Sequence, residues 1–131
     1  PAVFVFDALP NMSEPGIADR VENFIRALHK AHASTPIVLV ESIHHQAAWL
    51  NGARADTSAK NATLRKVRDA LENEIGKKLY YVTSEYLLGD DGEATVDGVH
   101  PTDVGFRCLA AAIEPAIAQA LGDSNAERKG S

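Results

Sequence analysis

Three segments of the chain repeat one pattern, a short continuous apolar run followed by a longer stretch with apolar residues on one helical face. Continuous runs, unlike alternating ones, are typical of parallel strands covered on both faces. The predicted strands are residues 2–6, 36–41 and 78–83. Apolar residues at i, i+4, i+7 and i+8 predict the helices that follow. These helices are expected at residues 17–33, 58–75 and 102–121.

The order β-α-β-α-β-α predicts the α/β class, with a flavodoxin-like parallel sheet between helical layers in a three-layer α/β/α arrangement. The length of 131 residues suits one domain. We expect this domain over residues 1–122, followed by a polar C-terminal tail over 123–131. Ligands of such folds bind at the carboxyl ends of the strands, so chemistry is expected in the loops there.

Charge and composition exclude several function classes. Thirteen basic against eighteen acidic side chains give a net charge of −5, which disfavours nucleic acid and anionic membranes as partners. The apolar runs fall short of the roughly 18–20 residues that span a bilayer, so no transmembrane helix is expected. The chain starts at Pro1, without a methionine, directly in an apolar run. We interpret this start as a cut, and no feature indicates a cellular compartment.

The strongest chemical signal is the segment Asp97-Gly98-Val99-His100-Pro101, directly ahead of a predicted helix. A histidine acts as a general base when a carboxylate accepts a bond from its second ring nitrogen and so fixes the tautomer. A turn that contains a glycine can place the two side chains next to each other. The alternative, that Asp97 is a turn residue and His100 a helix-capping residue, stays open from the sequence.

Residues 97–105 resemble the last conserved block of the SGNH hydrolases, also called GDSL-type esterases and acylhydrolases. That block reads D-G-x-H-P, then a small polar residue, a glycine and a final helix. The resemblance implies a Ser-His-Asp mechanism in which His100 is the catalytic base and Asp97 orients it. It covers only the C-terminal portion of the family fold, so it also implies that the nucleophilic serine lies upstream of this chain.

A second resemblance lies after the first predicted strand. The stretch Asp7-Ala8-Leu9-Pro10-Asn11-Met12 departs from the family's usual G-x-N-D form and is similar to a D-x-x-P-N-M variant of one GDSL-like branch. It implies that Asn11 donates to the oxyanion. An asparagine after proline is also a common turn residue, and this alternative stays open. The triplet Gly122-Asp123-Ser124 repeats letters of the nucleophile motif, but it follows a helix and no apolar strand, so we do not interpret it as one.

Weaker candidates occupy the loop after the second predicted strand. His44, His45 and Trp49 are expected to touch substrate. A metal site that joins the two histidines to His100 and Asp97 is the alternative. It is disfavoured because adjacent histidines in an extended loop point in different directions, and no third ligand has a recognisable spacing. We therefore expect neither a metal nor another cofactor.

Two functions follow from these residues. The first is a serine esterase or acylhydrolase that acts on a small-molecule ester, with acetylated carbohydrates as the preferred class. The fragment alone is then expected to be inactive. The second is a non-catalytic α/β module for ligand binding or assembly. In either case residues 3–6 read as a central strand without a neighbour on one side, which predicts self-association or pairing with a missing N-terminal half.

Overall fold

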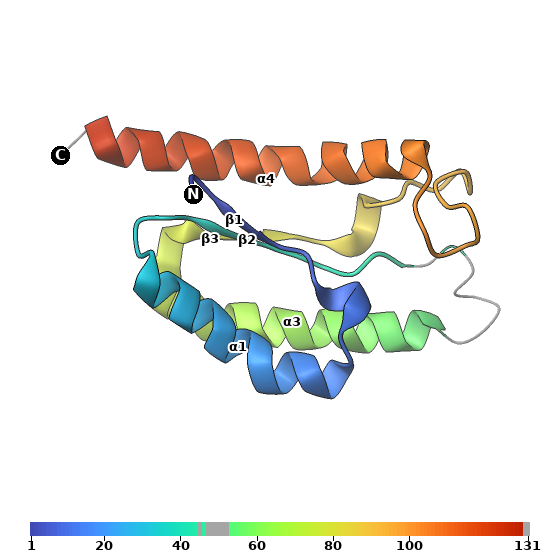
Figure 1. Cartoon of the computed structure of the whole chain (residues 1–131), viewed down its shortest axis with the longest axis horizontal. Helices are drawn as coiled ribbons and strands as arrows, with labels where there is room; N and C mark the ends of the chain where they lie inside the picture. Colours follow the sequence, from blue (N-terminus) through green and yellow to red (C-terminus); the bar gives the residue numbers. More distant parts are fainter. Residues whose placement is uncertain (45, 47–52, 130–131) are drawn as a thin grey trace.

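The structure is a computed structural model that describes residues 1–44, 46 and 53–129. Its centre is a three-stranded parallel sheet in the order β1-β2-β3 (Figure 1). The strands are β1 (Phe4–Phe6), β2 (Ile37–Val40) and β3 (Leu79–Val82). Val5 pairs with Val38, and Val38 pairs with Tyr80. The predicted α/β class with a parallel sheet is confirmed.

Helices cover both faces of the sheet, as Figure 1 shows. Helices α1 (Glu14–Ala31) and α3 (Ala53–Ile75) pack side by side on one face. Helix α4 (Asp103–Lys129) lies on the other face, against β2 and β3. The three layers of the predicted arrangement are therefore present, with two helices on one side and one on the other.

Two helices begin earlier than the sequence pattern predicts. Helix α1 begins at Glu14, because the Ser13 side chain accepts a hydrogen bond from the Gly16 amide and Pro15 fits the first helical turn. The expected start was residue 17. Helix α3 begins at Ala53, so Ser58 lies inside it and is not its N-cap. Gly76 follows the helix with a φ of 62°, which agrees with the predicted helix end at residue 75.

Helix α4 ends later than predicted. It continues through Gly122 to Lys129, although an end at residue 121 was expected. The residues beyond the glycine are acceptable helix formers, and the Tyr80 hydroxyl holds Asp123 by a hydrogen bond of 2.8 Å. The Gly-Asp-Ser triplet thus lies within a helix, which is not where a nucleophile on a tight strand-to-helix turn would stand.

Helix α4 also bears on the membrane expectation. Residues Asp103–Asp123 are long and apolar enough, by length and composition, to cross a bilayer, and 11% of this stretch is buried. The expectation that no segment reaches this length was wrong. The feature is a weak indication of a membrane segment, because single helices that pack in ordinary domains pass the same test. Leu109, Ile113 and Ile117 of this helix pack against buried apolar residues of the sheet, among them Val38 and Val40 of β2.

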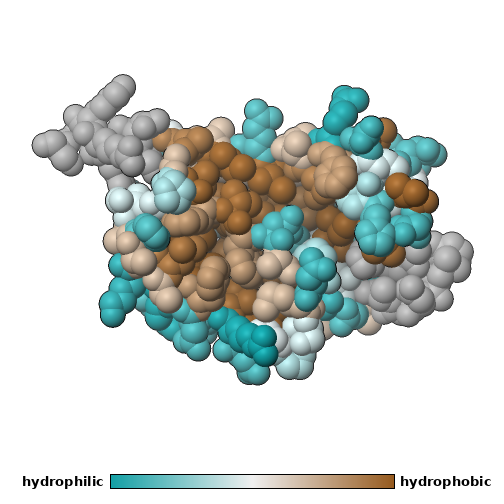
Figure 2. All heavy atoms as spheres, in the orientation of Figure 1, coloured by the Kyte–Doolittle hydropathy of each residue, from teal (hydrophilic) through white to brown (hydrophobic). Residues whose placement is uncertain are grey.

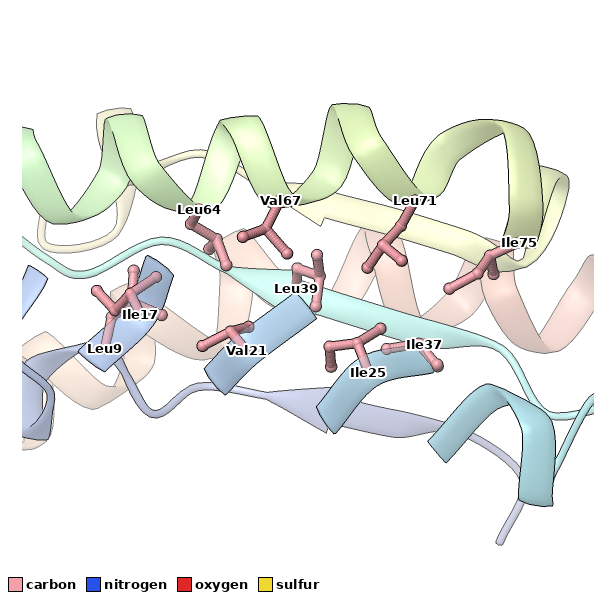
Figure 3. Close-up of a cluster of buried hydrophobic side chains, with 10 residues drawn as sticks. All are labelled: Leu9, Ile17, Val21, Ile25, Ile37, Leu39, Leu64, Val67, Leu71 and Ile75. Atoms are coloured by element: carbon pink, nitrogen blue, oxygen red, sulfur yellow. The ribbon is translucent and has the colours of Figure 1, made fainter. Parts of the chain in front are cut away.

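The apolar core divides along the alternation of the strands. Ile37 and Leu39 point from β2 toward α1 and α3, where they meet Ile25, Leu64 and Leu71 (Figure 3). The intervening β2 residues, Val38 and Val40, belong to a second cluster beneath α4. A continuous apolar strand is needed because both of its faces are buried.

The coverage is uneven over β1. Val5 in β1 is 43% exposed, whereas its neighbour Val38 in β2 is 0% exposed. Among the described residues β1 pairs with β2 alone, so its outer edge is open. Figure 2 shows apolar side chains gathered over this side of the molecule, and α4 adds the 59% exposed Phe106 to the exposed apolar surface.

Candidate active site

Asp97 and His100 lie in contact in the loop that leads into α4. The His100 Nδ1 atom is 2.7 Å from the Asp97 Oδ2 atom. The other carboxylate oxygen, Oδ1, accepts hydrogen bonds from the backbone amides of Val99 (2.9 Å) and His100 (2.8 Å). One carboxylate therefore fixes both the turn and the ring of the histidine that follows it.

Backbone bonds close the loop at residues 94–102, here termed the His100 loop. Thr95 forms an antiparallel bridge with Pro101, and the Val96 amide donates to the His100 carbonyl (2.8 Å). Gly98 has a φ of 84°, a conformation that residues with a Cβ rarely adopt. The sequence Asp-Gly-x-His is thus matched to a turn that returns the chain on itself.

The start of α4 fixes this loop from the other side. Thr102 is the N-cap, since its Oγ1 accepts from the Gly105 amide (3.1 Å) while its hydroxyl donates to the Glu93 carbonyl (3.0 Å). A Cβ on Gly105 would stand 2.1 Å from the Ala94 carbonyl oxygen. Gly105 is therefore required for the close approach of the loop base to the helix.

The electrostatics of the pair suit a base and its orienting acid. The backbone amide of His100, its ring and the amide of Val99 hold the pKa of Asp97 well below its usual range. The ionised carboxylate favours the tautomer with the proton on Nδ1, which leaves Nε2 as a hydrogen-bond acceptor. The His100 side chain is 77% exposed, so a reacting group can reach Nε2. Among the described residues the ring is hydrogen-bonded to Asp97 alone.

Asn11 stands at the same end of the sheet, after β1. It ends the short 3₁₀ turn Leu9–Asn11, which buried Leu9 anchors in the core. The backbone amide of Asn11 donates to the Ala8 carbonyl (3.1 Å), and Asn11 is exposed. The His100 loop and this turn both follow the carboxyl ends of the strands (Figure 1). Both residues are described, and no hydrogen bond joins Asn11 to His100. The oxyanion role of Asn11 therefore stays a prediction.

The substrate candidates after β2 are described only in part. His44 is half-buried in the extended segment that follows the strand. His45 and Trp49 lie outside the described residues. Within the described part of the chain, no three histidine, cysteine, aspartate or glutamate side chains form a group that could hold a metal ion.

A buried acid that the sequence interpretation passed over lies at the end of β2. The Glu41 carboxylate is fully buried and accepts from Arg65 Nε (2.6 Å), Tyr81 Oη (2.8 Å) and the Ser84 amide (2.8 Å). Burial opposes its ionisation, but the bonds from Arg65 and Ser84 outweigh burial and lower its pKa. Its signal in the sequence was a charged residue that ends an apolar strand. The network joins β2, β3 and α3 beneath the site.

Two amide side chains beside this network were also missed. Asn61 of α3 accepts from the Ser42 amide (2.8 Å) and donates to the Ser42 carbonyl (3.0 Å), both buried. Gln46 Oε1 accepts from Thr95 Oγ1 (2.6 Å) in the His100 loop. Neither residue has a sequence signature, because its hydrogen bonds join segments that are distant along the chain.

Comparison with known proteins adds the family. The model of the GDSL-like lipase/acylhydrolase family matches residues 1–118. A GDSL-like lipase of Bacteroides ovatus is 32% identical with a TM-score of 0.85, and the match covers 92% of this chain and 36% of that one. A second GDSL-like lipase, from Bacteroides thetaiotaomicron, is 18% identical with a TM-score of 0.59 and covers 92% and 64%.

A salicylyl-acyltransferase from a tetracycline biosynthetic pathway has the same fold, with a TM-score of 0.68 at 18% identity over 92% of this chain and 38% of its own. The chain thus spans about a third of the length of two of these proteins. No curated protein matches it in sequence. The resemblance seen in residues 97–105 is confirmed by the family match: the chain belongs to the GDSL-like lipase/acylhydrolase family.

Proposed function

We propose that this chain supplies the histidine and aspartate of a Ser-His-Asp esterase or acylhydrolase that cleaves carboxylic esters. The single observation that carries the proposal is the 2.7 Å contact between His100 Nδ1 and Asp97 Oδ2, in a loop where both carboxylate oxygens are occupied. Family membership supports it, because the family is hydrolytic. Among the described residues no serine hydroxyl is hydrogen-bonded to the His100 ring, and the nucleophile of this proposal lies outside the chain.

In the proposed reaction His100 Nε2 takes the proton of the serine hydroxyl as its oxygen attacks the ester carbonyl. The tetrahedral intermediate carries its negative charge on the former carbonyl oxygen, to which the Asn11 side-chain amide donates. His100 then gives its proton to the leaving alcohol. In the second half, His100 takes a proton from a water molecule that attacks the acyl-enzyme. His100 then returns the proton to the serine oxygen as the acid leaves. Asp97 stabilises the imidazolium in both halves and keeps its own charge.

The open edge of β1 is where the remainder of such a domain would attach. A parallel strand added to this edge has its carboxyl end beside Asn11, at the end of the sheet where His100 stands. A serine that follows such a strand would therefore come toward the base and the oxyanion donor. This pairing, and not self-association, is the arrangement that would complete the catalytic site.

The substrate class proposed is a small ester, with acetylated carbohydrates preferred. The net charge of −5 disfavours attraction to anionic lipid surfaces, and the open setting of His100 leaves room for a polar alcohol group. No cofactor is needed for this chemistry, since serine, histidine and aspartate supply nucleophile, base and orienting acid.

The test is hydrolysis of p-nitrophenyl acetate by the complete protein that contains this chain. His100→Ala and Asp97→Asn are each expected to lower kcat about 10³-fold or more. His32→Ala and Asp91→Asn are matched controls, the former at the end of α1 and the latter holding the Glu93 amide, and both should keep activity. Full turnover by His100→Ala would reject His100 as the catalytic base. No turnover by the unaltered protein on any of a panel of acyl esters would favour the non-catalytic ligand-binding or assembly module instead.

A further inference from the structure

We propose that Gln46 is a positioning residue for the His100 loop: its hydrogen bond with Thr95 links the segment after β2 to the base of that loop. The catalytic meaning of this bond rests on the proposed function. The bond itself, and its effect on the loop, can be measured without turnover.

The bond joins two segments that are far apart along the chain. Thr95 Oγ1 donates to Gln46 Oε1 over 2.6 Å, in a partly buried setting, across 49 positions in sequence. Thr95 is also the residue that forms the antiparallel bridge with Pro101, directly after His100. Gln46 is therefore connected to His100 through Thr95 and the bridge from Thr95 to Pro101.

The other side-chain hydrogen bonds of the His100 loop are local. Asp97 binds the amides of Val99 and His100, and Thr102 binds Glu93 and Gly105, so these bonds shape the loop and join it to α4. Among the described residues, none of these hydrogen bonds reaches directly to the segments that follow the carboxyl ends of β1 and β2. The bond from Thr95 to Gln46 reaches the segment after β2.

Gln46 can serve this purpose because the segment that carries it starts from a rigid base. Ser42 is held at both its amide and its carbonyl by Asn61, and Glu41 by Arg65 of the same helix. Buried, fully satisfied amide and carboxylate groups of this kind are costly to displace. Residues 41 and 42 are thus held by α3, and Gln46, four positions after Ser42, holds Thr95 in the His100 loop.

The experiment measures backbone hydrogen–deuterium exchange by NMR in this chain. The reporters are the Val96 and Thr102 amides, which donate across the loop base to His100 and Ala94 (2.8 and 2.9 Å). Loss of one hydrogen bond in Gln46→Ala should speed their exchange about three- to ten-fold. Gln46→Glu retains an acceptor oxygen and should restore slow exchange. Gln119→Ala on α4 is the matched control, and Leu39 in β2 reports global unfolding.

A double-mutant cycle assigns the effect to the bond. In a Thr95→Val background, Gln46→Ala should cause no further acceleration, because the partner hydroxyl is already gone. Unchanged exchange in Gln46→Ala, equal acceleration at Leu39, or additive effects in the double variant would each overturn the proposal.

Turnover of the complete protein distinguishes the positioning role of Gln46 from the proposed esterase activity. Gln46→Ala should lower kcat for p-nitrophenyl acetate with KM unchanged, and Gln46→Glu should recover it. Faster loop exchange in a protein that hydrolyses no ester would support the positioning bond and reject the esterase. Normal kcat in an active Gln46→Ala variant would reject the positioning role and leave the esterase intact.

Discussion

The two faces of the sheet differ in how completely they are covered. Beneath α1 and α3, the side chains of Ile25, Leu39 and Leu71 are fully buried. On the opposite face, α4 covers β2 and β3, while Val5 of β1 stays 43% exposed. The same strand pattern, apolar on both faces, thus meets a closed layer on one side and a partial layer on the other.

The covered face contains the contacts that stabilise the fold, and the partly covered face contains the candidate catalytic residues. The closed face contains the larger core and the Glu41 network that fixes the strand ends. The His100 loop runs into α4, on the partly covered face, and its ring is exposed. The arrangement fits a chain that spans about a third of two related structures, in which the site would be completed from the open side.

Core truncation should show the contrast most strongly. Leu71→Ala on the closed face is expected to lower the free energy of unfolding by about 2–5 kcal/mol, because a cavity replaces a fully buried side chain. Val5→Ala on the open face should cost less than about 1 kcal/mol, since much of that side chain is already in water. Urea unfolding measures both. Equal losses would mean that the two faces are equally closed.

The junction of the His100 loop with α4 is the tightest place on the open side. Gly105→Ala is expected to cost about 1–3 kcal/mol, because its Cβ would meet the Ala94 carbonyl oxygen. Gly122→Ala in the same helix meets nothing within 4 Å and should stabilise the chain by about 0.5–1 kcal/mol. Thermal unfolding of the pair provides the check. A neutral Gly105→Ala would show that loop and helix are not in close contact.

Acid should weaken the closed face through Glu41. Its pKa in the folded chain lies below the ordinary 4.5, so its stabilisation is complete above that pH and is lost as the pH falls through the folded value. Glu41→Gln is expected to cost about 1–2 kcal/mol at pH 7 and to flatten the loss of stability between pH 5 and 3. Exposed Glu72→Gln is the control. An unchanged acid slope in Glu41→Gln would contradict this role.

The open edge itself gives the smallest effect on folding and the clearest effect on association. The isolated chain is expected to self-associate at high micromolar concentration through β1. Val5→Lys should abolish this while changing the free energy of unfolding by less than about 1 kcal/mol. Tyr86→Lys, at a more exposed hydrophobic position beyond β3, should leave association unchanged. Sedimentation of the unaltered chain as a strict monomer would show that the open edge of β1 does not mediate association.

The sequence predicted the elements that depend on local patterns. Three apolar runs became three parallel strands, and the Asp97–His100 spacing became a direct contact, because a turn of three residues leaves few other arrangements. Helix ends were less predictable. The first helix was expected from residue 17, but it begins at Glu14, because Pro15 fits a first helical turn.

Long-range contacts were beyond the sequence. The need for glycine at position 105 depends on where Ala94 lies, and the partner of Gln46 is 49 positions away. The uneven cover of the sheet depends on which strands α4 crosses. No periodicity within a segment encodes these distances, so they follow only from the assembled fold.

The central claim is that this chain holds His100 as a base, with Nδ1 bound to an ionised Asp97 and Nε2 directed outward. The most direct test is the ¹⁵N NMR spectrum of the His100 ring at a pH where the ring is neutral. The account predicts a proton on Nδ1 and an unprotonated Nε2, with this preference lost in Asp97→Asn. A neutral ring protonated on Nε2, or one that Asp97→Asn leaves unchanged, would contradict it.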